Sequence, residues 1–219
     1  MHSHLNLHSQ VVEAPPGAQA ATLDIKGAYH TIPCKPDHKC FLVVIFKGLF
    51  YMDHNIPFGL GSAAGLQGEV ADCIIDLWNA LKVDPAVKWV DNFDIFRFPS
   101  PNGKFYSTVD GIIYHYDYDL DSMKEMIALL GVPWHKTKGS DFSNIFVYVG
   151  FTWDLTQKTV SLPEKKHIKY LNKLTIFLQK YKHAQVPKRE LESVIGTLSH
   201  HLCFPTWSII HVKSLRISH

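Results

Sequence analysis

The stretch Lys88-Trp-Val-Asp-Asn-Phe-Asp-Ile95 is the most informative part of this chain. Its pattern predicts a short strand, a two-residue turn that carries an acid, and a second strand. An acid at such a tip can meet a second acid on a neighbouring strand, and the two can bind a divalent metal. The sequence offers that partner at Asp24, within Thr22-Leu-Asp-Ile-Lys-Gly-Ala-Tyr29. The tip also carries an amide, Asn92, where a second carboxylate would strengthen a metal site.

The composition predicts one or two globular units. The chain has 219 residues, of which 46% are hydrophobic and 19% charged, enough to build an adequate core. No apolar run approaches the roughly 20 residues that a membrane span needs. The first ten residues lack the basic and apolar regions of a signal peptide. The four cysteines form no Cys-x-x-Cys pair, which favours reduced thiols in an intracellular protein.

The net charge is only +2, but it is unevenly distributed. Residues 155–219 hold 11 of the 22 Lys and Arg residues and 3 of the 20 Asp and Glu residues. Residues 1–154 therefore hold the other 11 basic and 17 acidic residues. An acidic body with a basic tail predicts a polyanionic partner for the tail. The alternative is that the basic residues form an ordinary solvated helical face.

The patterns divide the chain into a lead-in, a mixed body and a helical tail. Residues 1–20 are polar and end in a Pro- and Gly-rich stretch, which predicts a flexible lead-in. Residues 21–160 alternate between strand and helix patterns. Within them, the apolar run Cys40–Phe46 predicts a buried strand that forms a hairpin with Leu49–Met52. The body also contains a predicted helix that opens near Pro57–Gly68 and ends near Leu81, the hairpin Val87–Phe98, a helix at Ser122–Leu130, and strands at Ile145–Trp153 and Thr159–Leu162.

Residues 161–219 predict a basic, all-helical segment. Ser161-Leu-Pro-Glu164 fits a capping box, in which Ser and Glu satisfy each other's free backbone donors. A long helix follows, with one apolar stripe. The lysines that lie mostly off this stripe are Lys165, Lys166, Lys169, Lys173 and Lys180.

Asp24 and Asp91 are the first candidate site. Nucleotidyl transfer needs divalent ions that stabilise both the attacking and the leaving oxygen. Mg²⁺ prefers oxygen ligands and takes one or two carboxylates together with substrate phosphates. The alternative for Asp91-Asn92 is a plain hairpin turn, because both residue types tolerate left-handed backbone.

The glycine-rich stretch Pro57-Phe-Gly-Leu-Gly-Ser-Ala-Ala-Gly65 resembles a dinucleotide fingerprint. That motif should follow a hydrophobic strand directly and belong to a βαβ unit with an acid about 20 residues later. Here Ile56 and Pro57 precede the glycines, and the next predicted strand is the acidic hairpin. These departures argue against a Rossmann-type oxidoreductase. The histidines show no zinc-binding spacing, so the sequence predicts no zinc site.

Several of these segments, in this order, resemble the palm of a reverse transcriptase. Leu23–Ile32 resembles the first catalytic motif, Ile56–Ala63 the template- and nucleotide-positioning motif, and Trp89–Phe93 the aromatic-x-Asp-Asp motif. Leu130–Lys138 resembles the lysine-bearing motif, and Tyr148–Phe151 resembles the primer-grip turn. Ser161–Lys166 and Val194–Leu198 are similar to the thumb of retrotransposon enzymes, nearest the DIRS-like and gypsy-like groups. The resemblance covers about residues 21–215 and implies an α+β fold: an antiparallel palm sheet with packed helices, then a helical thumb.

The resemblance also implies roles for particular residues. Asp24 and Asp91 would bind Mg²⁺ or Mn²⁺, and Lys138 would lie near the triphosphate and protonate pyrophosphate. Tyr29 would be the steric gate that rejects a 2′-hydroxyl. The residues expected to shape the nucleotide pocket are Pro57, Phe58 and Gly59. The basic helix, with Lys165, Lys166, Lys169 and Lys173, would grip the backbone of an RNA or DNA template-primer, a salt-sensitive contact.

Two departures from the family pattern predict impaired polymerase activity. Asn92 replaces the second acid of the turn. Losing one unit charge about 4 Å from a dication costs on the order of several kcal/mol, or roughly a hundredfold to several thousandfold in rate. Asp94 could compensate only if the hairpin register shifted. Only 23 residues precede Asp24, where the family has a fingers subdomain that binds the triphosphate of deoxynucleotides. The alternative function is a non-catalytic nucleic-acid-binding remnant of a retroelement.

Overall fold

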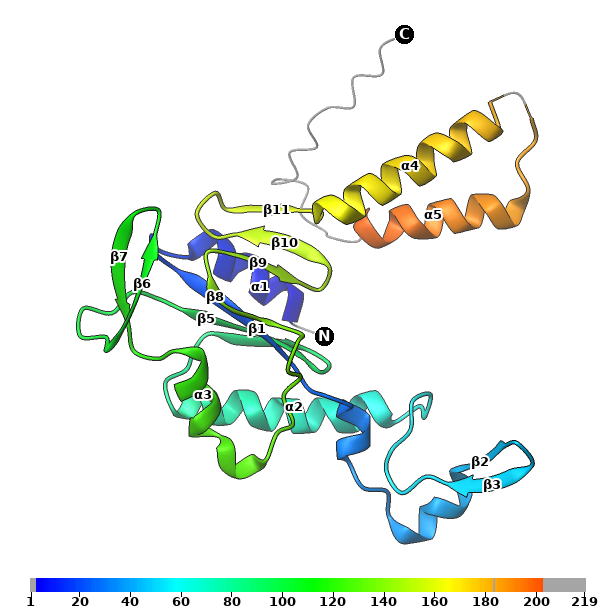
Figure 1. The fold of residues 1–219 in the computed structure, drawn as a ribbon, viewed down its shortest axis with the longest axis horizontal. Helices are drawn as coiled ribbons and strands as arrows, with labels where there is room; N and C mark the ends of the chain where they lie inside the picture. The colour runs from blue at the N-terminus through cyan, green and yellow to red at the C-terminus, as the bar shows by residue number, and fades with distance from the viewer. Residues whose placement is uncertain (1–2, 183, 203–219) are drawn as a thin grey trace.

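The structure, a computed structural model, describes residues 3–182 and 184–202 of the chain. Helices are combined with antiparallel sheets, so the predicted α+β class is confirmed (Figure 1). The elements are α1 (Ser3–Glu13), β1 (Gln19–Asp24), η1 (Ala28–Thr31), η2 (Pro36–Phe41), β2 (Val43–Phe46), β3 (Leu49–Met52), α2 (Ala63–Ala80), β4 (Ala86–Trp89), β5 (Asn92–Arg97), β6 (Phe105–Val109), β7 (Ile112–Tyr116), α3 (Leu120–Met126), η3 (Ala128–Leu130), β8 (Ser140–Ser143), β9 (Ile145–Tyr148), β10 (Phe151–Asp154), β11 (Thr159–Ser161), α4 (Glu164–Lys180) and α5 (Lys188–Leu202).

A four-stranded antiparallel sheet in the order β4-β5-β1-β8 forms the centre of the body. Strands β4 and β5 form the hairpin that the sequence predicts, and Trp89 lies opposite Asn92 where the two strands meet. Strand β1 pairs with β5 over its whole length, and the last pair is Asp24 with Asn92. This register brings the end of β1 to the tip of the hairpin. The antiparallel order also differs from the parallel βαβ sheet that a Rossmann fold requires.

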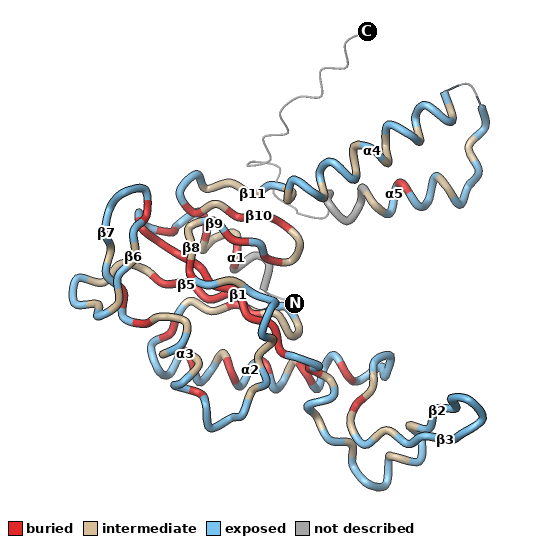
Figure 2. The backbone as a smooth tube through the Cα atoms, viewed as in Figure 1, coloured by how far each residue is buried: buried red, intermediate tan, exposed pale blue. Residues whose placement is uncertain are grey.

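The two faces of this sheet enter two separate cores, because successive strand residues point to opposite faces. On one face Leu23, Phe93 and Ile95 pack with Trp78 of α2 and Met123 of α3. On the other face, Ala20 and Phe96 pack with buried residues of α1, β9 and β10, namely Leu7, Val11, Phe146, Tyr148, Phe151 and Trp153. The sheet is therefore covered on both sides, and buried residues are concentrated along β1 and β5 (Figure 2).

The prediction that residues 1–20 form a flexible lead-in is wrong for the described part of this segment. Residues 3–13 form α1, and Leu7 and Val11 are only 1% and 2% exposed. These two residues are four apart and so lie on the same helix face, which packs on the sheet. Only this narrow stripe of the helix packs on the sheet, so the rest of the segment can be polar.

The hairpin of β2 and β3 is present as predicted, but the buried strand expected at Cys40–Phe46 is not. Strand β2 begins at Val43, and all eight residues of the two strands are exposed (Figure 2). The hairpin lies at one end of the molecule, beyond η2 (Figure 1). Within the described residues it forms a separate two-stranded sheet. Its apolar side chains stay exposed because no other layer covers them there. A second hairpin, β6–β7, was not predicted from the sequence.

The helices α4 and α5 pack against each other and extend away from the sheet (Figure 1). The predicted capping box at Ser161 is wrong, because Ser161 ends strand β11 and the helix begins at Glu164 without a side-chain cap. No residue of α4 is buried. Among the described helices, none is long and apolar enough to cross a membrane.

Candidate active site

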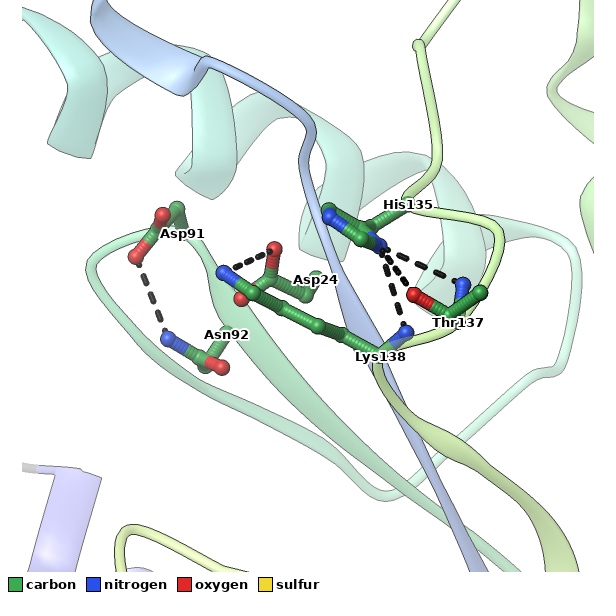
Figure 3. Close-up of polar contacts among 6 residues, drawn as sticks. All are labelled: Asp24, Asp91, Asn92, His135, Thr137 and Lys138. Carbon is green, nitrogen blue, oxygen red and sulfur yellow. Dashed lines mark hydrogen bonds and ion pairs between the residues drawn. The ribbon is translucent and has the colours of Figure 1, made fainter.

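The two acids singled out in the sequence lie at the same end of the central sheet. Asp24 is the last residue of β1 and is only 6% exposed. The backbone N–H of Ile25 donates a hydrogen bond to the carbonyl oxygen of Asp91 over 3.0 Å, so the turn lies directly against the end of β1. Figure 3 shows Asp24 and Asp91 on these neighbouring segments. The structure therefore brings together the two residues predicted as metal ligands.

The tip of the hairpin is held in a fixed conformation. Its left-handed residue is Val90, with a φ of 57°, and not Asp91 or Asn92. A β-branched residue is rarely found in this region, which stores about 1–3 kcal/mol of strain. The Asn92 amide donates to the Asp91 carboxylate over 3.1 Å. The hydroxyl of Tyr148 donates to the Asn92 carbonyl, also over 3.1 Å.

Lys138 joins this site from the loop before β8. Its Nζ lies 3.4 Å from Oδ1 of Asp24, and its side chain is 61% exposed against 8% for the aspartate (Figure 3). His135 holds the loop in place, because its backbone N–H donates to the Asp24 carbonyl over 2.8 Å. The His135 ring nitrogen Nδ1 accepts from the backbone N–H of Lys138 and of Thr137, each over 3.2 Å.

Asp94 does not compensate for the missing acid, so that alternative is wrong. The hairpin register is not shifted, and Asp94 lies opposite Thr22, two residue pairs along the strands from the Asp24–Asn92 pair. Its side chain is completely buried, and neither carboxylate oxygen has a hydrogen-bond partner among the described residues. Burial raises the pKa of the Asp94 carboxyl well above its usual value. A carboxyl that is enclosed in the core is not available to a metal ion at the tip.

The predicted nucleotide-pocket residues form a second cluster. The rings of Tyr29 and Phe58 meet edge to face, with 4.8 Å between their centroids. Phe58 is 72% exposed, and the neighbouring Gly59 has a φ of 91°, a conformation that suits glycine. Pro57 precedes them and is partly buried. The structure thus brings Tyr29 to the turn Pro57–Gly59, while their roles toward a nucleotide stay predictions.

The four lysines predicted to bind nucleic acid lie on α4 but differ in their surroundings. The Lys173 ammonium donates to the Ser193 carbonyl at 3.0 Å and to the Thr197 hydroxyl at 2.7 Å, both on α5. Lys166 donates to the Gly150 carbonyl over 3.3 Å. Lys165 and Lys169 are exposed. Two of the lysines therefore connect parts of the protein, and the other two face solvent.

The residues at the tip supply two carboxylates, which is enough for part of the coordination shell of one divalent ion but not for a complete set of protein ligands. No group of three or more His, Cys, Asp and Glu side chains that could hold a metal occurs in the described part of the chain. Two carboxylates are nevertheless the number that Mg²⁺ commonly takes from a protein, with substrate phosphates and water completing the shell. Asp24 and Asp91 could hold such an ion.

The sequence did not reveal two hydrogen bonds and one backbone conformation that hold this site. The bond from Tyr148 to Asn92, the anchor from His135 to Asp24, and the left-handed Val90 all depend on the tertiary arrangement. Tyr148 and His135 lie inside motifs noted in the sequence, but their partners are 56 and 111 positions away. These partners could have been paired only if the arrangement of the strands had been known.

No protein-family model and no curated protein matches the sequence. Solved structures do. A foamy viral protease–reverse transcriptase in complex with an RNA/DNA hybrid matches 83% of this chain with a TM-score of 0.55 at 17% identity. A second foamy viral protease–reverse transcriptase structure, in complex with double-stranded DNA, matches 87% with a TM-score of 0.55 at 14% identity. A third, also with double-stranded DNA, matches 83% with a TM-score of 0.53 at 16% identity.

The chain has a reverse-transcriptase-like fold. Because the identities are so low, this likeness concerns the fold alone. The chain also spans only 21%, 29% and 32% of the three solved chains. Asp24 and the Asp91 turn lie at adjoining strand ends in this fold, and their roles as metal ligands stay predictions.

Proposed function

We propose that this chain is a reverse-transcriptase-like domain that binds a template-primer and catalyses RNA-directed DNA synthesis at a much reduced rate. Its origin in a DIRS-like or gypsy-like retrotransposon is part of the same proposal. The observation that carries it is the meeting of Asp24 with the Asp91 turn at one end of an antiparallel sheet. The structural likeness to reverse transcriptases supports the proposal at the level of the fold.

Asp24 and Asp91 would hold Mg²⁺ or Mn²⁺. When bound, such an ion supplies charge stabilisation for the attacking and leaving oxygens of nucleotidyl transfer. The Asn92 amide orients the Asp91 carboxylate through their 3.1 Å hydrogen bond. Tyr29, braced by Phe58, would lie under the sugar of a deoxynucleoside triphosphate and exclude a 2′-hydroxyl. Lys138 would lie beside the triphosphate and donate a proton to the leaving pyrophosphate.

The reduced rate follows from Asn92. An amide in place of a carboxylate removes one negative charge next to the proposed metal site, which lowers the rate by roughly a hundredfold to several thousandfold. The exposed lysines Lys165 and Lys169 support binding to a phosphate backbone. Binding of nucleic acid should therefore survive better than catalysis.

A primer-extension assay on an RNA template tests the proposal. With Mg²⁺ or Mn²⁺ present, Asn92→Asp should raise extension by roughly a hundredfold or more, because it restores the second acid. Asp24→Asn should abolish extension. Asp76→Asn is the matched control, because Asp76 is an exposed acid on α2 and its loss should leave extension unchanged. If Asn92→Asp gives no gain, the assignment of Asp91 is wrong.

A second candidate function is nucleic-acid binding without catalysis. It is favoured by the ion pair between Lys138 and Asp24, which reduces the negative charge at the proposed metal site. This candidate predicts that template-primer binding falls steeply with salt and is unchanged by Asp24→Asn. Metal-dependent incorporation of a nucleotide would refute it.

A further inference from the structure

Among the described residues, the side chain of Asp24 forms one ion pair, and its partner is a cation. The ammonium of Lys138 lies 3.4 Å from its Oδ1. Asp24 is largely buried whereas Lys138 is mostly exposed, so water screens this pair from the lysine side only. Lysine presents a compact positive charge with three donors, and a carboxylate oxygen accepts those donors or binds a metal ion.

The loop that carries Lys138 is anchored on both sides of this contact. Before it, Trp134 bridges to Ile25, and the His135 N–H donates to the Asp24 carbonyl. After it, Gly139 packs against the Thr22 carbonyl so closely that a Cβ at this position would lie 2.3 Å from the oxygen. The φ of Gly139 is also positive, at 97°. A glycine is therefore required here, and it lets the loop come close enough for Lys138 to reach Asp24.

The backbone of Lys138 is itself fixed. Its N–H donates to Nδ1 of His135, which turns residues 135–138 into a tight loop around the imidazole ring. The other lysine in the loop, Lys136, is exposed, and it forms no ion pair with an acid among the described residues. Figure 3 shows the side chain of Lys138 reaching Asp24, and of the two lysines in this loop Lys138 is the one that pairs with an acid among the described residues.

The contact between Lys138 and Asp24 changes the net charge that a metal ion would meet at the tip. The two carboxylates, Asp24 and Asp91, would bring two negative charges to a metal ion, and Asn92 brings none. Lys138 offsets one of the two. A divalent cation that approaches Asp24 must therefore displace or repel the ammonium, which costs affinity.

We propose that Lys138 is a resident counter-ion that competes with the divalent metal for Asp24 and so lowers the metal affinity of the site. This inference rests on the proposed function, because it takes Asp24 as a metal ligand. It assigns Lys138 a role in the absence of substrate that is separate from proton donation to pyrophosphate.

The test is a calorimetric titration of the full chain with Mn²⁺ alone, without nucleotide or nucleic acid. Lys138→Met keeps most of the side-chain length and removes the charge, so it should tighten Mn²⁺ binding roughly tenfold. Lys138→Arg keeps the charge and should bind no more tightly than the natural chain. Lys136→Met removes one charge from the same loop and should change the affinity less than twofold. Thermal unfolding of each variant without metal establishes that it is folded.

The outcomes separate this inference from the proposed function. Loss of Mn²⁺ binding in Asp24→Asn, together with tightening in Lys138→Met, supports both. Loss in Asp24→Asn without tightening in Lys138→Met overturns the counter-ion role and leaves the metal site standing. Equal tightening in Lys136→Met and Lys138→Met overturns it as well, because the effect would then be general electrostatics. Unchanged binding in Asp24→Asn removes Asp24 as a ligand and overturns the proposed function.

Discussion

Strands β5 and β2 are built from opposite kinds of residue and end in opposite environments. Strand β2, Val43-Val-Ile-Phe46, is wholly apolar, yet all four of its residues are exposed. Strand β5 contains Asp94 and Arg97, yet every residue from Phe93 onward is buried. The difference is position: β5 has a partner strand on each side and a packed layer on each face, whereas β2 has one partner strand. Apolar composition alone therefore does not decide which strand forms the core.

The two charged residues of β5 are themselves treated differently. The Arg97 guanidinium lies between the rings of Tyr116 and Phe142, 4.1 Å and 4.2 Å from their centroids. It donates to the Gln19 side-chain oxygen at 2.6 Å and to the Tyr118 carbonyl at 3.0 Å. Asp94 has no such partners among the described residues. A single buried strand thus contains one well-satisfied polar residue and one that is not.

The largest effect should come from a matched pair of isoleucines in the two strands. Ile95 is 0% exposed and Ile45 is 67% exposed. Ile95→Ala should lower the free energy of unfolding by about 2–5 kcal/mol, because it leaves a cavity in the core. Ile45→Ala should change it by less than about 0.5 kcal/mol. Urea unfolding followed by circular dichroism measures both, and similar losses would show that the hairpin is buried in solution.

Arg97→Met should have the next largest effect. It leaves the Gln19 oxygen and the Tyr118 carbonyl without their donor inside the protein. The expected loss in the free energy of unfolding is about 3 kcal/mol. Arg97 and Lys104 both line a pocket of about 360 Å³, and Lys104 is exposed, so Lys104→Met is the control. A loss as large in the control would mean that the pocket, and not the buried guanidinium, matters.

Asp94→Leu should act in the opposite direction. Removing a buried acid without partners should raise the free energy of unfolding at neutral pH by about 1–3 kcal/mol. Burial raises the pKa of Asp94 in the folded state. The contribution of Asp94 to the free energy of unfolding is therefore fully present below the unfolded pKa of about 3.9, and it is lost as pH rises through the folded pKa. The advantage of the variant should therefore grow from pH 4 to pH 7. Asp94→Asn should remove the same pH dependence, and an advantage that is constant with pH would contradict the argument.

The smallest effect concerns two lysines of α4. Lys173→Met should destabilise the packing of α4 on α5 by about 1 kcal/mol, because it removes the donor to Ser193 and Thr197. Lys169→Met should leave the stability unchanged and weaken template-primer binding by a few fold, with a shallower salt dependence. Thermal unfolding and fluorescence anisotropy separate the two effects. If Lys173→Met weakens binding without changing stability, Lys173 contacts nucleic acid instead.

Features that depend on a short segment of sequence were predicted correctly more often than features that depend on packing between distant segments. The hairpin around Asp91 and the helix ending near residue 80 follow from short-range patterns, and the α+β class follows from the family resemblance; the structure confirms all three. Helix α1 was missed, because its core contact consists of a narrow stripe in a polar segment. The burial expected for Cys40–Phe46 was wrong, because a continuous apolar run says nothing about whether another layer will cover it.

By itself, the sequence determined the chemistry that is available at the tip: an acid in a two-residue turn, an amide beside it, and a second acid that ends a strand. Those identities are local, and so is the strand and turn pattern that carries them. Only the tertiary structure decided that Lys138 contacts Asp24, that Asp94 is enclosed and unpaired, and that β2 and β3 stay exposed. The physical reason is that burial and charge pairing are set by which distant segments meet, and residues 24, 91 and 138 meet only once the sheet has its register.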